Sequence, residues 1–89
     1  MAKIAVAASS GDVYHVTVEE GVSRTTHDVT VTPDDVERYA SGASAERLVE
    51  ASFRFLLERE PKESILSRFE LPVIERYFSD YPVKIREKL

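Results

Sequence analysis

The amino-acid sequence predicts an α+β fold in which an antiparallel β-hairpin, or a three-stranded meander, is followed by four to five short helices packed on one sheet face. Two segments with alternating apolar residues, 13–18 and 25–31, flank a glycine-containing turn. Apolar residues then recur at helical spacing after residue 44, and three prolines divide the C-terminal third. A length of 89 residues fits one domain, so we expect residues 1–89 to form a single unit.

The two alternating segments predict strands that each bury one face. Side chains two positions apart in a strand point to the same side, so each segment presents an apolar row. Gly21, between the segments, tolerates the positive φ that a tight hairpin turn requires. The residues expected on the buried faces are Tyr14, Val16 and Val18 in the first segment and His27, Val29 and Val31 in the second.

The first ten residues allow two interpretations. Residues 3–8 alternate weakly through Ile4 and Val6, which fits an edge strand that would complete a meander. A turn signal of serines, glycine and aspartate follows at residues 9–12. Alternatively, residues 1–10 form a loose leader outside the folded unit.

Capping residues mark two helix starts. Thr32 precedes Pro33 at the first helical position, and the acidic residues that follow face the positive end of the helix dipole. This short helix is expected to end near Gly42. Ser44 caps a longer helix whose wide apolar stripe indicates the central helix, packed against the sheet. The stripe comprises Leu48, Val49, Ser52, Phe53, Phe55, Leu56 and Leu57.

Prolines at positions 61, 72 and 82 break the remaining chain into short helices. Proline removes a backbone donor inside a helix but is tolerated in its first turn. We therefore expect a helix to begin at each proline. The inner faces would be formed by Ile65, Leu66 and Phe69, then by Val73, Ile74, Tyr77 and Phe78, and finally by Val83, Ile85 and Leu89.

Composition excludes several classes of protein. The chain has no cysteine, which rules out disulfides and thiolate metal sites. No apolar run approaches the roughly 20 residues of a membrane span, and the N-terminal apolar stretch is too short for a signal peptide. These observations indicate a cytoplasmic protein without membrane contact.

The sequence shows no catalytic, cofactor-binding or metal-binding constellation. His15 and His27 fall on opposite faces of the predicted hairpin, so they do not converge on one metal ion. No serine lies in a nucleophile-elbow pattern, and the three glycines are too far apart for a phosphate-binding loop. We therefore expect a protein that is not an enzyme and carries no cofactor.

Residues 63–78 allow a nucleic-acid-binding interpretation. Two short helices joined by a tight turn would bring Arg68 and Arg76 near phosphates. Three observations oppose this: the turn lacks glycine, the second helix is very short, and Glu70 and Glu75 are acidic where a DNA-reading helix is polar or basic. The N-terminal half, with three basic and seven acidic side chains in residues 1–43, would also repel phosphate.

Aromatic residues are concentrated in the helical half, with six between residues 53 and 81. One interpretation is that the central helix buries them on two sides: Phe53 and Phe55 are two positions apart and point to different sides, one toward the sheet and the other toward the C-terminal helices. The other is an exposed patch for a partner. The residues assigned to this candidate interaction surface are Phe69, Tyr77, Phe78 and Tyr81.

The leading functional hypothesis is a non-enzymatic protein-interaction or accessory module with a protein partner or a second copy of itself. The aromatic excess and the unpaired edges of a small hairpin support it, because an open edge can add a strand from another chain. The alternative is a small nucleic-acid-binding regulator that uses the 63–78 helix pair.

The stretch from residue 51 to 78 carries a resemblance. Its sequence ASFRFLLEREPKESIL, followed by Arg68-Phe69 and by IERYF at 74–78, resembles a small family of uncharacterised bacterial proteins. In that family a strand of the Thr-His-Val-Thr-Val type precedes the helices, and the match covers about residues 13–85 in outline. The resemblance implies a bacterial cytosolic source and a hairpin-plus-helices fold, and it implies no catalytic activity.

Overall fold

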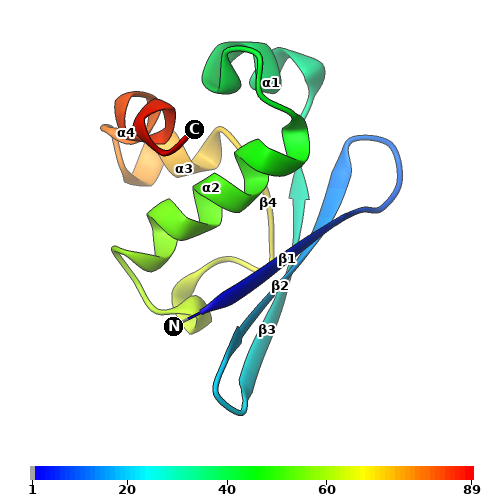
Figure 1. Ribbon diagram of the computed structural model, residues 1–89, viewed down its shortest axis with the longest axis vertical. Helices are drawn as coiled ribbons and strands as arrows, with labels where there is room; N and C mark the ends of the chain where they lie inside the picture. Colours follow the sequence, from blue (N-terminus) through cyan, green and yellow to red (C-terminus); the bar gives the residue numbers. More distant parts are fainter. Residues whose placement is uncertain (1) are drawn as a thin grey trace.

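A four-stranded mixed sheet with helices on one face forms the framework of the protein (Figure 1). The computed structural model describes residues 2–89. The strands lie in the order β1-β2-β3-β4, so the sheet follows the order of the chain. The strands are β1 (Lys3–Ala8), β2 (Val13–Glu20), β3 (Ser23–Thr30) and β4 (Arg68–Glu70). The helices are α1 (Pro33–Ala40), α2 (Ala45–Leu57), α3 (Val73–Tyr77) and α4 (Tyr81–Lys88), with a 3₁₀ turn, η1 (Lys62–Ser64).

The first three strands form an antiparallel meander. Residues 3–8 are a strand paired with β2 and not a loose leader; Met1 lies outside the described residues. Gly21 adopts a φ of 58° in the tight turn between β2 and β3, a conformation that glycine adopts without strain. The alternation predicted from the sequence is confirmed: Val16 and Val18 of β2 and His27 and Val29 of β3 all point into the core.

The region after Pro61 differs from the sequence prediction. Ile65, Leu66 and Phe69 do not form a helix face, because the chain makes the short 3₁₀ turn η1 and then strand β4. β4 pairs parallel with β3, Val29 lying opposite Phe69. The N–H of Asp28 donates to the carbonyl of Ser67 at 2.8 Å, and the N–H of Leu71 donates to that of Thr30 at 3.0 Å. The open edge of β3 thus receives a partner that local spacing did not reveal.

The caps of the first two helices agree with the prediction. The Thr32 hydroxyl accepts from the N–H of Asp35, whose carboxylate accepts from the N–H of Thr32, a reciprocal capping box. Ser41 ends α1 with a left-handed φ of 48°. The Ser44 hydroxyl accepts from the N–H of Arg47 and begins α2. These contacts fix the sharp turn between α1 and α2.

Helix α2 is buried on two sides and joins the two halves of the core. Phe53 lies toward the sheet, with its ring centroid 5.2 Å from His27 and 6.1 Å from Phe69. Phe55 lies toward the C-terminal helices, 5.2 Å from Tyr81 and 5.8 Å from Phe78. Both phenylalanines are fully buried, as the two-sided interpretation of the sequence expected.

Phe53→Ala should lower the free energy of unfolding by about 3–5 kcal/mol, because it removes a fully buried ring from between the sheet and α2. Urea unfolding followed by circular dichroism measures the change. Val22→Ala, at the fully exposed tip of the β2–β3 turn, is the control and should change the free energy by less than about 0.5 kcal/mol. Equal effects of the two substitutions would contradict the described core.

Candidate functional site

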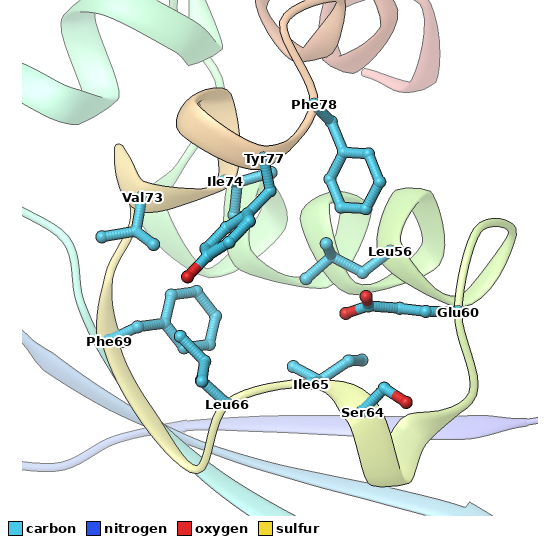
Figure 2. A pocket seen from close by; sticks show the side chains of 10 residues that line it. All are labelled: Leu56, Glu60, Ser64, Ile65, Leu66, Phe69, Val73, Ile74, Tyr77 and Phe78. Carbon is cyan, nitrogen blue, oxygen red and sulfur yellow. The ribbon is translucent and has the colours of Figure 1, made fainter.

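A groove with a cavity volume of about 360 Å³ opens between the C-terminal end of α2, the η1 loop, β4 and α3 (Figure 2). Eight of its ten lining residues are apolar or aromatic, so the surface it offers is suited to another apolar group. The lining residues are Leu56, Glu60, Ser64, Ile65, Leu66, Phe69, Val73, Ile74, Tyr77 and Phe78.

Two side chains of the groove expose large apolar surface to solvent. Tyr77 is 70% exposed and Leu66 is 47% exposed, and within residues 2–89 only Val22 and Val83 are comparable. Figure 2 shows the Tyr77 ring extending from α3 toward Phe69 and Leu66. Phe69 and Ile74 are buried and form part of the groove's base. The groove therefore joins a fixed base to an uncovered apolar rim.

Glu60 is the only charged residue that lines the groove. Its side chain is half-buried, and Figure 2 shows the carboxylate between Leu56 and Ile65, directed into the cavity. The nearest basic residues along the chain are engaged elsewhere: Arg59 pairs with Asp80 at 3.1 Å, and Lys62 pairs with Glu63. Among residues 2–89, no ion pair neutralises the Glu60 carboxylate. The apolar groove thus contains one negative charge available to a ligand.

His27 holds the Leu66 wall in place. Its side chain is 2% exposed, and its Nδ1 lies 2.8 Å from the carbonyl oxygen of Leu66. Because a carbonyl only accepts, Nδ1 carries the proton and donates. Nε2 then accepts from the Thr25 hydroxyl at 2.8 Å. Sequence reasoning placed His27 on the buried face but did not reveal that its ring anchors a segment 39 residues away.

Tyr39 and Arg38 of α1 hold the α3 side of the groove. The Tyr39 hydroxyl donates to the Glu75 carboxylate at 2.7 Å, and the Arg38 guanidinium lies 3.3 Å from the same oxygen. Burial, followed by the hydrogen bond to Glu75 and the negative charge of Glu75, raises the pKa of Tyr39 to about 12. Glu75 precedes the groove residue Tyr77 by two positions, so this contact fixes the helix that presents the exposed ring.

Lys62 anchors η1 to the tip of the β2–β3 hairpin. Only 4% of its side chain is exposed, and its ammonium pairs with Glu63 and, at 3.5 Å, with Glu20 of β2. The hydrogen bond to Glu63 raises the pKa of Lys62, and the same contact lowers the pKa of Glu63. The Ser23 hydroxyl also donates to Glu63. This cluster fixes the position of η1, and so of the loop that lines the groove, beside the sheet.

Three of the four predicted interaction residues meet at the groove. Phe69 contributes to its base, Phe78 is half-buried in its wall, and Tyr77 is at its rim. Tyr81 does not belong to this surface: it is fully buried, and its hydroxyl lies 2.7 Å from that of Ser52 inside the core. Its place at the start of α4 turns the ring onto Phe55, which spacing along the sequence did not show.

The predicted helix pair at residues 63–78 is wrong. Arg68 lies in β4, with Asp28 of β3 as its neighbour in the register, and Arg76 lies in the five-residue helix α3. A helix-turn-helix needs two helices in direct succession, whereas here a strand stands in the place of the first. Residues 63–78 therefore do not form a helix-turn-helix that could bind DNA.

The two histidines lie on opposite faces of the sheet, as predicted. His15 is on the solvent face, where its Nδ1 lies 2.9 Å from Asp28, while His27 is in the core. Within residues 2–89, no group of three or more His, Cys, Asp or Glu side chains is arranged to hold a metal ion. None of the helices described for residues 2–89 combines the length and apolar character needed to cross a membrane.

Comparison of the chain with protein-family models, with curated proteins and with solved structures found no match. The resemblance to uncharacterised bacterial proteins therefore stays a prediction, and functional inference depends on the geometry of the groove.

His27→Leu should lower the free energy of unfolding by about 1–3 kcal/mol, because the partly buried hydrogen bond from His27 to the Leu66 carbonyl is lost. Hydrogen exchange should quicken at residues 65–67. His15→Leu, which removes only an exposed pair, is the control and should cost less than about 1 kcal/mol. Slow exchange at residues 65–67 in both variants would show that His27 does not anchor this segment.

Raising the pH above 10 should destabilise the protein through Tyr39. The unfolded chain releases the Tyr39 proton near the ordinary pKa of 10.0, whereas the folded protein retains it until about 12. The unfolded state thus binds fewer protons in this window, and stability falls by up to about 1.4 kcal/mol per pH unit from this group. Urea midpoints of the wild type and Tyr39→Phe should converge as the pH rises from 10 to 12. Parallel pH curves would contradict the assignment.

Proposed function

We propose that the protein is a non-enzymatic, cytosolic interaction or accessory module that binds a segment of a partner protein in the groove. The segment carries a large apolar side chain, followed by a lysine or arginine. The observation that carries the proposal is that the exposed side chains of Tyr77 and Leu66 line the same cavity as the unneutralised carboxylate of Glu60.

The apolar anchor follows from the size and lining of the cavity. A volume of about 360 Å³ lies at the lower end of the range of about 300–1,000 Å³ for ligand pockets, which suits one or two side chains. Covering Tyr77 and Leu66 removes apolar surface from water and contributes roughly 25 cal/mol per Å² buried. Tyrosine is also among the residues that contribute most when an interface covers them.

The basic neighbour follows from the position of Glu60. A partner that covered the groove without supplying a cation would bury an unpaired carboxylate, which is costly. A lysine or arginine beside the apolar anchor turns that cost into a charge-assisted hydrogen bond. Glu60 therefore selects against apolar segments that lack a positive charge.

The lining of the groove favours binding over catalysis. A general acid and a general base must be positioned around a reacting group, and here one carboxylate stands among apolar side chains. His27, Tyr39 and Lys62 hold the elements around the groove through contacts outside it. A groove held in this way loses little freedom when it binds, which supports recognition by a preformed surface.

A random-peptide display library selected on the wild-type protein tests the proposal. The enriched peptides should combine an aromatic or leucine residue with a nearby lysine or arginine. Tyr77→Ser should weaken binding of an enriched peptide by about tenfold or more, because the ring is the largest exposed contact. Glu60→Lys should weaken it further by charge repulsion, and Glu60→Gln should have an intermediate effect. Isothermal calorimetry measures each affinity.

Two matched controls separate the groove from the general surface. Val83→Ser removes a comparably exposed apolar side chain from α4, and Glu37→Lys makes the same charge change on α1. Neither residue lines the groove, so both variants should bind the peptide as the wild type does. Peptides without a basic residue, or equal losses in control and groove variants, would refute the proposed mode of recognition.

A further inference from the structure

Strand β1 leaves one edge of the sheet unpaired. β1 pairs with β2 through Lys3–Ala8, and no other strand of residues 2–89 joins it. In Figure 1 it is the dark blue strand that crosses in front of its neighbours. In an antiparallel pair, alternate residues direct their N–H and C=O groups away from the partner strand. Half of the six residues of β1 therefore offer backbone donors and acceptors outward.

The two edges of the sheet are protected very differently. At the opposite edge, β4 has only three residues, two of which are the exposed charged Arg68 and Glu70. Short length and charge are the usual means by which a protein prevents edge pairing. β1 has six residues, no proline, and Lys3 at its first position as its only charge. The small alanine side chains at 5, 7 and 8 do not shield its backbone.

We propose that β1 pairs antiparallel with β1 of a second copy of this chain, around a two-fold axis that passes through Ala5. The two sheets then join into one of eight strands. In this register Ile4 of one copy lies opposite Val6 of the other, and Lys3 lies opposite Ala7. Side chains opposite each other in an antiparallel pair share a face, so the register matches apolar with apolar and brings no like charges together.

The side chains that this register pairs favour a second copy over an unrelated strand. Ile4 and Val6 are half-buried against the core and lack a neighbour on the open side of β1, and each supplies the missing neighbour of the other. On the solvent face, Ala5 meets Ala5 at the axis, where small side chains allow close approach. The exposed side chains of α2, the helix packed over β1, carry both charge signs, so a second α2 brought alongside meets no single-sign repulsion.

The symmetry and the size of this interface indicate a weak dimer. An antiparallel edge that pairs with itself uses the same surface on both subunits, so the assembly closes at two copies. A pairing of one short strand buries less than the roughly 1,200–2,000 Å² of a stable specific interface. We therefore expect a reversible dimer whose population rises with protein concentration.

Sedimentation equilibrium of the purified chain from about 1 μM to about 1 mM tests the proposal. The wild type should pass from monomer to dimer over this range, and hydrogen exchange at residues 3–8 should slow with concentration. Ala5→Lys places two lysines together at the axis and should shift the midpoint at least tenfold upward. Because Ala5 is exposed, the monomer should keep its circular dichroism spectrum.

Three further variants test whether the effect is specific to the β1 edge. Thr26→Lys adds the same charge to the exposed face of β3 and should leave the midpoint unchanged, and Ala5→Thr places a small uncharged β-forming residue at the axis and should preserve the dimer. Tyr77→Ser should also leave the midpoint unchanged, because the groove is separate from β1. A monomer at every concentration, or a dimer lost in Tyr77→Ser and kept in Ala5→Lys, would overturn the proposal.

Discussion

The parallel pairing of β4 with β3 is the interaction on which the course of the C-terminal third depends. β3 ends the meander with one edge open, and its backbone groups require partners once the helices cover the sheet. Residues 67–71 supply them in an extended conformation. The chain must therefore return to the sheet after α2 and leave it again before α3. The groove forms where the return segment, α2 and α3 meet, so its existence follows from this pairing.

The walls of the groove are positioned from outside by polar contacts that each join distant segments. His27 connects β3 to Leu66, Tyr39 connects α1 to Glu75, and Lys62 connects η1 to Glu20 of the hairpin. Buried polar groups of this kind stabilise only when every partner is present, so they specify one arrangement of the loop rather than adding much net stability. The apolar interior of the groove can then stay uncovered without the lining side chains collapsing inward.

The sequence predicted those parts of the fold that depend on neighbouring residues. Thr32, Ser44 and the alternation around Val16 and Val29 act locally, and each element they predicted is present. β4 was missed because Ile65 and Phe69 also fit helical spacing, and the deciding partner is the edge of β3, about forty residues earlier. Tyr77 is exposed and Phe78 is half-buried, whereas the burial of Tyr81 depends on where α4 meets α2. Glu60 carried no local signal, because an unpaired carboxylate is recognised only when its surroundings are known.

The distance along the chain between β3 and β4 has a consequence for folding. The two hairpins of the meander close over short loops, whereas β3 can gain its parallel neighbour only after α1 and α2 have folded back over the sheet. Loop-closure entropy delays that step, so a folding intermediate consisting of the meander alone would have two open edges. During synthesis on the ribosome β3 emerges well before β4, and the polar Thr26 and Asp28 on its solvent side, with His15 of the neighbouring β2, then lie beside an unpaired backbone. Such side chains disfavour stacking between nascent chains, which gives the solvent face of the sheet a protective role before the fold is complete.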